Sequence, residues 1–438
     1  MRLALPFAIL TVLAAPGAAL AEVVPGASTN AVLAVAADGT PRVASESSGR
    51  LTIAARDANG AWSTVRAGAL PGAGALLEGI AVEPSGAVDV LAGDAHGRWL
   101  ALADARGVHV LARPAKTATV GVAGLTLDGA GRPVVAYATL VAAKRHTFLR
   151  LVRRTAAGRY ATTAITKLGF PITSGVPSAA PVLMPDGSIR VVETYPSAAI
   201  EWSPLAHDWQ GQFLFIDGLH LGAPAGPVDA AAAAGGVYSA WTELYPSYGV
   251  SDVLLVLHLD GEHQSVLHRH AFLVALAVGP QGPELAANDY ADLGTSLDYA
   301  GLVLDANGNA LELDGRIAGY AVDATGARQL LLAGADGLQW LRAPVLPTSQ
   351  VSLAASTSGG QVALSGRVAG ATAGSVALYR EQREGVRTLV ATVPLGADGS
   401  FAASDAAPPA PSTYRAVYVD ATSGLPVASL LRTPVQTR

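Results

Sequence analysis

Short apolar runs separated by glycine-containing turns dominate the first three quarters of the chain. No long stretch keeps an apolar residue at every third or fourth position, as an amphipathic helix would require. One turn pattern recurs with a glycine at positions 39, 86, 131, 187, 236, 282 and 326, at intervals of 44 to 56 residues. Asp-Gly and Asn-Gly pairs supply the positive φ of tight two-residue turns at low cost. Each such pair therefore predicts a β-hairpin.

A recurrence of this length built from strand-sized runs predicts the four-stranded blades of a β-propeller. About seven units fit the spacing, with six and eight left open, and the last unit, from Gly319 to Pro344, lacks one strand. Val23 to Ala27 is the candidate for that strand and would close the ring. The alanine run at 230–234 has a high helix propensity, but we predict an innermost strand there, because crowding near the axis favours small side chains.

After Arg342 the periodicity stops, and a different fold is predicted. Seven short strand candidates follow one another: Val351–Ala355, Gln361–Val368, Ser375–Arg380, Thr388–Pro394, Ser400–Ala403, Thr413–Asp420 and Val427–Val435. This number and spacing of strands are typical of an immunoglobulin-like or fibronectin-III-like β-sandwich. We therefore predict an all-β protein with a β-propeller at 22–344, a linker at 345–350 and an Ig-like β-sandwich at 351–438.

The first 21 residues have the three parts of an export signal peptide. Met1 and Arg2 give a positive start, an apolar segment follows from Leu3 to Ala15, and Ala19-Leu20-Ala21 is a small-x-small cleavage site. The apolar segment is shorter than the roughly 20 residues that span a bilayer, so we predict cleavage and no transmembrane segment. The chain has no cysteine, and hence neither a lipid-anchor thiol nor a disulfide. We expect a bacterial protein that is secreted or periplasmic.

Composition narrows the classes of function. Among 438 residues there are 48 Gly and 27 Pro, 14% are charged, and the formal net charge is −5. These values indicate a compact, turn-rich protein and not a disordered one. Only three lysines occur, Lys116, Lys144 and Lys167, and no basic tract could neutralise several phosphates in a row. We therefore expect no nucleic-acid partner. As a separate expectation, a monomer is favoured.

Polar residues follow the second strand of several units, at ends that a propeller brings together near its axis. The residues singled out are Glu193, Tyr195, Glu243 and Tyr245, which share the sequence Glu-x-Tyr-Pro-Ser, together with Tyr137 and Tyr290. Tyrosine combines an apolar ring with a hydroxyl, and glutamate supplies an acceptor, which suits sugars, cationic peptides or calcium. We predict that these six residues bind a glycan or protein ligand. Ordinary polar loop ends left by repeat duplication are the alternative interpretation.

Non-enzymatic binding or scaffolding is the predicted function, with no catalytic residue and no cofactor. Two alternatives stay open. Glu193 and Glu243 would serve as acid and base of a polysaccharide-acting hydrolase or lyase if one carboxyl were desolvated. The other alternative is a structural envelope component without a small ligand.

Histidines and tryptophans are expected to be structural. Four histidines, at positions 258, 263, 268 and 270, alternate between two faces of a predicted hairpin, so their side chains would not converge on a metal ion. We expect a solvated outer hairpin there and no metal site. Most of the six tryptophans are expected to pack between sheets, and sugar stacking is the alternative.

The unit that runs from Asp38 through Leu51 to Trp62 resembles the blade pattern of secreted bacterial propellers loosely related to sialidases. It begins Asp-Gly-x-Pro-x-Val-Ala, and the resemblance extends over about residues 30–344. It implies a six- or seven-bladed ring with any ligand site on the axis. The Asp box of sialidases, Ser-x-Asp-x-Gly-x-Thr-Trp, is not matched, because Asp57 and Gly60 are one residue too far apart and Ala55 replaces the serine. With no matching arginine trio either, the resemblance implies no catalysis.

Overall fold

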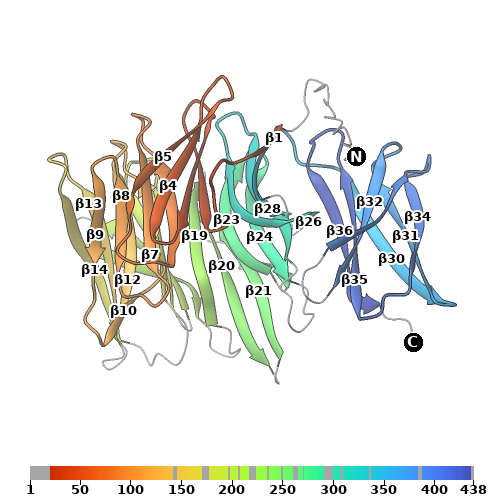
Figure 1. Cartoon of the computed structure of the whole chain (residues 1–438). Helices are drawn as coiled ribbons and strands as arrows, with labels where there is room; N and C mark the ends of the chain where they lie inside the picture. The colour runs from red at the N-terminus through yellow and green to blue at the C-terminus, as the bar shows by residue number, and fades with distance from the viewer. Residues whose placement is uncertain are drawn as a thin grey trace.

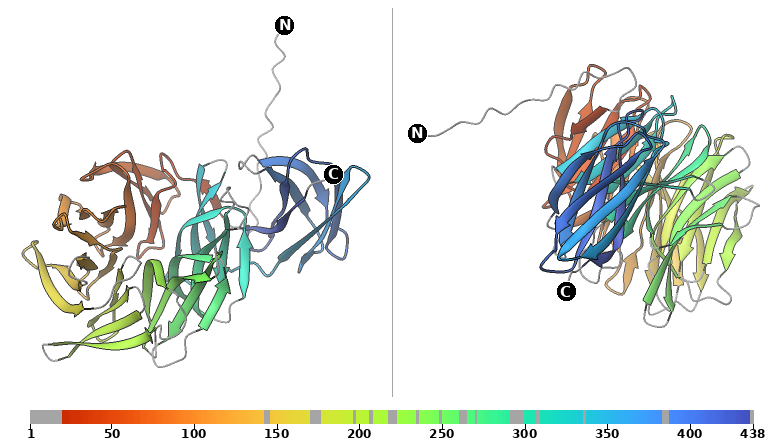
Figure 2. Two further views of the ribbon diagram at one scale, coloured as in Figure 1. Left: turned by 90° about the horizontal axis from the view of Figure 1, so that it is seen from below. Right: turned by 90° about the vertical axis from the view of Figure 1, so that its right-hand side faces the viewer.

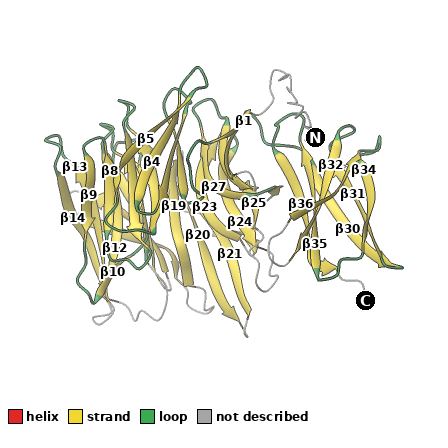
Figure 3. Cartoon of the chain, viewed as in Figure 1, coloured by secondary structure: helices red, strands yellow, loops and turns green. Residues whose placement is uncertain are grey.

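The protein is all-β in a computed structural model, and no helix occurs in the part of the chain that the structure describes (Figure 3). The structure describes residues 20–141, 146–169, 177–195, 198–205, 208–216, 223–233, 236–247, 250–259, 265–269, 271–290, 299–305, 309–334, 337–382 and 387–435. Within these residues, nothing helical is long and apolar enough to cross a membrane.

Consecutive strands pair antiparallel in sheets that follow the order of the chain. The first sheet contains β2 (Ala31–Val35), β3 (Pro41–Ser47), β4 (Arg50–Arg56) and β5 (Trp62–Ala69), and the second contains β6 (Ala75–Val82), β7 (Val88–Asp94), β8 (Leu100–Asp104) and β9 (Gly107–Ala112). In the third, β10 (Ala118–Val120) and β11 (Gly124–Leu127) both pair with β12 (Pro133–Val141), which is followed by β13 (His146–Arg154) and β14 (Tyr160–Gly169).

The same arrangement continues through the middle of the chain. The next sheets are β15 (Ser178–Leu183), β16 (Ile189–Tyr195), β17 (Ala198–Leu205) and β18 (Asp208–Ile216), then β19 (Ala223–Ala233), β20 (Gly236–Ser247), β21 (Val250–Leu259) and β22 (Ser265–Arg269). They are followed by β23 (Ala271–Gly279), β24 (Gly282–Tyr290), β25 (Tyr299–Leu304) and β26 (Ala310–Leu313), and by β27 (Arg316–Val322), β28 (Arg328–Gly334) and β29 (Gly337–Ala343).

These sheets form a closed, propeller-like ring. Their first strands contact one another in the order β2, β6, β11, β15, β19, β23 and β27, and β27 contacts β2 again. Seen from below, the sheets surround a common centre (Figure 2). The alanine run predicted to be an innermost strand lies in β19, which confirms that prediction for the described residues 230–233.

The ring is closed by an N-terminal strand, as the sequence predicted, but at a different position. β1 (Leu20–Val23) pairs antiparallel with β29, with Leu20 opposite Arg342 and Val23 opposite Gln339. The predicted strand, Val23 to Ala27, therefore begins three residues after the observed start of β1 at Leu20. β1 also includes Leu20 and Ala21, which lie on the N-terminal side of the predicted cleavage point.

The recurrent glycines adopt positive φ at all seven positions, from 71° at Gly131 to 148° at Gly236. The predicted two-residue turn is nevertheless wrong for most units. At Gly39, the glycine N–H donates to Ala36 O and Ala36 N–H donates to Thr40 O, which defines a three-residue loop with only its last residue at positive φ. Asp38 supports the loop instead by accepting a hydrogen bond from Thr40 N–H at 3.0 Å.

Seven strands follow the ring, in the places predicted from the sequence. They are β30 (Gln350–Ser358), β31 (Gln361–Ala369), β32 (Ser375–Gln382), β33 (Arg387–Pro394), β34 (Ser400–Ala406), β35 (Ser412–Val419) and β36 (Pro426–Val435). One sheet has the order β30-β31-β34, and the other the order β36-β35-β32-β33. β36 joins β26 of the ring through the pair Leu313 and Val427, so the two parts lie side by side (Figure 1).

Apolar side chains fill the space between neighbouring sheets. One cluster joins Val134 and Leu149 of the third sheet to Ile189 and Trp202 of the fourth. Trp99, Trp202, Trp241 and Trp340 are all buried, which agrees with the packing role predicted for tryptophan. Because the chain has no disulfide, these interfaces must provide most of the stability of the ring.

Candidate functional site: an axial cavity

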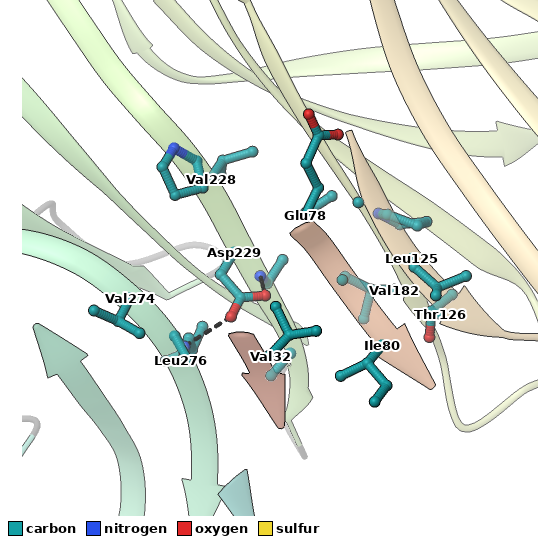
Figure 4. A pocket seen from close by; sticks show the side chains of 18 of the residues that line it. Val32, Glu78, Ile80, Leu125, Thr126, Val182, Val228, Asp229, Val274 and Leu276 are labelled. Atoms are coloured by element: carbon teal, nitrogen blue, oxygen red, sulfur yellow. Dashed lines mark hydrogen bonds between the residues drawn. The ribbon is translucent and has the colours of Figure 1, made fainter. Parts of the chain in front are cut away.

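The innermost strands enclose a cavity of about 360 Å³ on the axis of the ring. Each of them contributes to the wall, for example through Val32, Ile80, Leu125, Val182, Val228, Val274 and Ala318 (Figure 4). The lining side chains are mainly small and aliphatic, because strands that converge on an axis leave room only for small side chains. Most of the accessible surface of the wall is nevertheless polar. No Arg, Lys or His occurs among the residues known to line this cavity.

Two of the lining residues, Glu78 on β6 and Asp229 on β19, carry a carboxyl group. Each lies at a β-bulge. The pairing of β6 with β7 shifts between Leu77 and Gly79, and that of β19 with β20 shifts between Ala225 and Asp229. A bulge adds an unpaired residue and redirects the side chains around it. The strict alternation assumed for a strand therefore fails here, and the sequence analysis missed both residues.

The carboxyl of Glu78 lies against Gly93 of β7, which is not among the residues that line the cavity. Its Oε2 accepts a hydrogen bond from Ala123 N–H at 2.9 Å, and no donor among the described residues lies within hydrogen-bond distance of Oε1. Burial raises the pKa of Glu78 to about 8. A Cβ at Gly93 would overlap Oε1, so the glycine on the neighbouring strand leaves room for the carboxyl.

Asp229 has both of its oxygens occupied. Oδ1 accepts from Ala230 N–H and Oδ2 from Leu276 N–H, each at 2.8 Å. Burial raises the pKa of Asp229, although these two backbone donors oppose the shift. Asp229 therefore offers a negative or neutral surface to the cavity but little remaining capacity to accept hydrogen bonds.

The carboxyls of Glu78 and Asp229 each accept a hydrogen bond from a backbone N–H of the next sheet, those of Ala123 and Leu276. This contact between sheets does not require an acidic side chain. At other junctions, neutral side chains accept a hydrogen bond from a backbone N–H of the following innermost strand: Asn30 from Leu77, Ser178 from Val228, Thr242 from Leu273 and Asn288 from Ile317. Because an amide or hydroxyl accepts the equivalent hydrogen bond at these other junctions, the contact between sheets alone does not explain why residue 78 is an ionisable glutamate.

The two glutamates predicted from the sequence do not line the cavity. Glu193 and Glu243 are fully buried. Glu193 Oε2 accepts from Trp202 Nε1 at 3.2 Å, and burial raises its pKa to about 8. Glu243 Oε1 accepts from Trp241 Nε1 at 2.8 Å. Trp202 packs against the third sheet and Trp241 joins the fourth sheet to the fifth, so the two carboxyls lie in separate interfaces.

The predicted tyrosines are only partly described. Tyr137 is buried among Leu91, Leu102 and Val152, between the second and third sheets, and burial raises its pKa. The side chains of Tyr195, Tyr245 and Tyr290 lie outside the described residues. The binding role predicted for these three side chains stays a prediction.

The histidine prediction needs one correction. His258 is buried at 6% exposure, so this part of the hairpin is not solvated as expected. The side chains of the other three histidines lie outside the described residues. In the described ranges, no group of three or more His, Cys, Asp or Glu side chains is placed to hold a metal ion.

A second polar pocket, of about 490 Å³, lies between the second and third sheets, but its charges neutralise one another. Arg106 pairs with Asp104 at 2.7 Å and Arg154 with Glu83 at 2.6 Å. Asp89 is fully buried nearby, with Arg154 Nη1 at 4.0 Å. Burial, reinforced by the negative charge of Glu83, raises the pKa of Asp89 to about 7. We regard this cluster as structural.

Comparisons with known proteins give matches of low identity and low TM-score. No family model and no curated protein matches the chain. Among solved structures, a mutant of AofleA from Arthrobotrys oligospora shares 11% identity over 68% of this chain and 91% of its own, with a TM-score of 0.41. A puromycin hydrolase shares 17% identity over 77% of this chain and 50% of its own, with a TM-score of 0.43. The Penicillium chrysogenum alpha-L-arabinanase complexed with arabinobiose shares 11% identity over 60% of this chain and 91% of its own, with a TM-score of 0.38. Similarities of this degree assign no activity to this chain.

Proposed function

We propose that this is an exported, non-enzymatic binding protein that takes its ligand into the axial cavity of the ring. The observation that carries the proposal is the cavity of about 360 Å³ that the innermost strands line on the axis of the ring. Cavities of this size are typical of small-ligand sites. The volume favours a small molecule, or one side chain of a protein ligand, over a long glycan.

The proposal includes a finer description of the architecture. The ring is a seven-bladed propeller, supported by the contact sequence of innermost strands that returns from β27 to β2. The C-terminal part is an Ig-like sandwich, supported by its three-stranded and four-stranded sheets. Export is supported by the sequence of residues 1–21 alone.

Binding is favoured over hydrolysis by the positions of the predicted acids. A glycosidase needs two carboxyls that flank one bond. Glu193 and Glu243 are fully buried on opposite sides of one sheet, so they form no such pair. Asp229 is a poor partner for Glu78, because both of its oxygens already accept backbone hydrogen bonds.

The test is a binding screen with a variant that fills the cavity. Small sugars, amines, carboxylates and peptides are screened by ligand-observed NMR against the wild type and Ile80→Trp, whose larger ring would occupy the axial space. Val65→Trp, on an outer strand at a position 63% exposed, is the matched control. We expect hits that disappear with Ile80→Trp and persist with Val65→Trp.

Thermal unfolding of both variants checks that they remain folded, and Val182→Phe provides a second way to fill the cavity if Ile80→Trp does not fold. Hits that survive a filled cavity would show that binding occurs elsewhere on the protein. A complete absence of hits would favour the structural envelope component without a small ligand.

A further inference from the structure

The backbone of the innermost strands narrows the class of ligand, on the premise of the proposed function that the axial cavity is the binding site. We infer that the cavity binds a small uncharged polyol, such as a single sugar, through backbone N–H and C=O groups. Most of the accessible wall is polar, yet only four described lining residues have polar side chains, namely Glu78, Thr126, Asp229 and Tyr320. The backbone must therefore supply much of the polar surface.

Each innermost strand is an edge of its sheet. The strands β2, β6, β11, β15, β19, β23 and β27 each pair with one other strand only, the second strand of the same sheet. Bonded and non-bonded residue pairs alternate along an antiparallel ladder, so every second residue of an edge strand has an N–H and a C=O outside the ladder. Because these edges face the axis, such groups point into the cavity.

The register identifies the residues concerned. The first hairpin closes with the hydrogen bond from Ala36 N–H to Thr40 O, so Leu33, three residues before Ala36, lies in a non-bonded pair with Val43. Counting back in the same way from the other hairpins gives one residue in each sheet. Those that have an N–H are Leu33, Ile80, Leu125, Ala230, Leu276 and Tyr320, and all of them line the cavity.

Two of these N–H groups already bind an oxygen atom. Ala230 N–H donates to Asp229 Oδ1 and Leu276 N–H donates to Asp229 Oδ2, each at 2.8 Å (Figure 4). Both hydrogen bonds agree with the direction that the register gives to the donors. The remaining N–H groups at this level face the cavity without a partner strand in the described part of the chain; they belong to Leu33, Ile80, Leu125 and Tyr320.

An uncharged ligand fits this wall better than an ion. No basic side chain occurs among the described lining residues, the carboxyl of Glu78 lies against Gly93, and both oxygens of Asp229 are occupied. An ion would lose its hydration in the cavity without an available counter-charge. Each edge residue also presents both an N–H and a C=O, so an anion would meet carbonyl oxygens and a cation would meet N–H groups.

A polyol matches these backbone groups. A hydroxyl both donates and accepts, so it can bind either to an N–H or to a C=O. An apolar ligand would leave the same groups without hydrogen bonds, which is unfavourable in a buried site. One polyol also replaces several ordered waters at once. The cavity of about 360 Å³ lies within the range of roughly 300–1,000 Å³ typical of small-ligand sites.

The experiment compares neutral sugars with charged sugars of the same shape by ligand-observed NMR titration. Glucose, mannose and galactose are the neutral probes. The corresponding uronates and 2-amino sugars, measured at pH 6, are the charged probes. We expect at least one neutral sugar to bind, and its charged counterparts to bind roughly tenfold more weakly or less. Equal or tighter binding of a charged counterpart would overturn the polyol assignment.

Proline substitution tests the role of the backbone, because it removes one N–H from the axis and leaves the ladder on the other side of the strand intact. Pro181 already lies at the equivalent position of β15, opposite Val191, so this level of the fold accepts proline. We expect Ile80→Pro to weaken sugar binding about 3- to 10-fold. Ile80→Ala is the matched control, since it shortens the side chain further but keeps the N–H. It should bind like the wild type.

Leu125→Pro and Leu125→Ala provide a second matched pair if Ile80→Pro does not fold, which thermal unfolding reveals. Equal weakening by proline and alanine would assign recognition to the side chain and overturn the inference. Unchanged sugar binding in a folded proline variant would overturn it as well.

Failure of the polyol class and failure of the proposed function give different results. If no neutral sugar binds, but a charged or apolar compound of the screen does and Val182→Phe abolishes its binding, the polyol class is wrong and the proposed function stands. If a sugar binds equally well to folded Val182→Phe, the axial cavity is not the site and both fail. Both also fail if no compound binds.

Discussion

At the scale of single residues, burial raises the pKa of several carboxyls, among them those of Glu78, Glu193 and Asp89. Burial raises the pKa of Glu78 and Glu193 to about 8 and that of Asp89 to about 7. A carboxyl whose pKa is higher in the folded than in the unfolded state destabilises the fold once it must ionise. Of these three residues, only Glu78 is among those that line the axial cavity.

Asp89 lies away from the cavity, and it tests whether a buried carboxyl with a raised pKa destabilises the fold when it ionises. Its pKa of about 7 lies above its ordinary value of 3.8, so the free energy of unfolding should fall as the pH rises from 4 to 7 and stay low above 7. Asp89→Asn has no proton to lose. It should be more stable than the wild type at pH 8, by on the order of 2 kcal/mol, and about equal to it near pH 4.

Urea denaturation at pH 4, 6 and 8 measures this difference. Asp57→Asn, in an exposed turn, is the control and should give no such trend. If the difference in unfolding free energy between Asp89→Asn and the wild type grew towards low pH, the raised pKa of Asp89 would be contradicted.

At the scale of elements, the turn glycines set the register of the hairpins. Gly187 has φ of 82°, and a Cβ there would meet no atom within 4 Å, so any cost of a side chain comes from the backbone alone. The bulges act at the same scale, because the extra residue between Leu77 and Gly79 changes the direction of the Glu78 side chain relative to simple alternation.

We predict that Gly187→Ala destabilises the protein by about 1–2 kcal/mol, because alanine is strained at positive φ. Gly129→Ala is the matched control: it also lies in an exposed turn with no atom within 4 Å of the added Cβ, but its φ is not in the left-handed region. It should be neutral or slightly stabilising. Chemical denaturation of both variants makes the comparison, and equal effects would show that the turn conformation is not what requires glycine at 187.

At the scale of the whole molecule, stability depends on closing the ring with the N-terminal strand. Glu22 of β1 accepts hydrogen bonds from Arg56 Nε at 2.9 Å and from Trp62 Nε1 at 2.7 Å, which links the closing strand to the first sheet. Arg56 also lies over the ring of Trp340 on β29, at 5.0 Å from its centroid. Residues that are more than 300 positions apart thus meet around one carboxylate.

We expect Glu22→Gln to destabilise the protein by about 1–3 kcal/mol, since the charge-assisted bonds to Arg56 become weaker. These bonds to Arg56 hold the pKa of Glu22 below its ordinary value of 4.5. Their contribution is therefore complete above about pH 4.5 and disappears as the pH falls through the lowered pKa. Thermal unfolding at pH 7 and at pH 3 should show a large difference between variant and wild type at pH 7 and a small one at pH 3. A difference that persists at pH 3 would mean that charge at Glu22 is not the cause.

Local chemistry determined a large part of this fold. Turn glycines with their aspartates, alternating apolar runs and the spacing of the units predicted a propeller-like ring, the innermost strand at the alanine run and seven C-terminal strands, because each of these features depends on a few neighbouring residues. The tertiary structure alone decided which polar groups share a space. It buried Glu193 and Glu243 in separate interfaces and placed the carboxyl of Glu78 against Gly93 of the neighbouring strand. A bulge and the packing of distant sheets set the direction of a side chain, and neither is encoded within one strand.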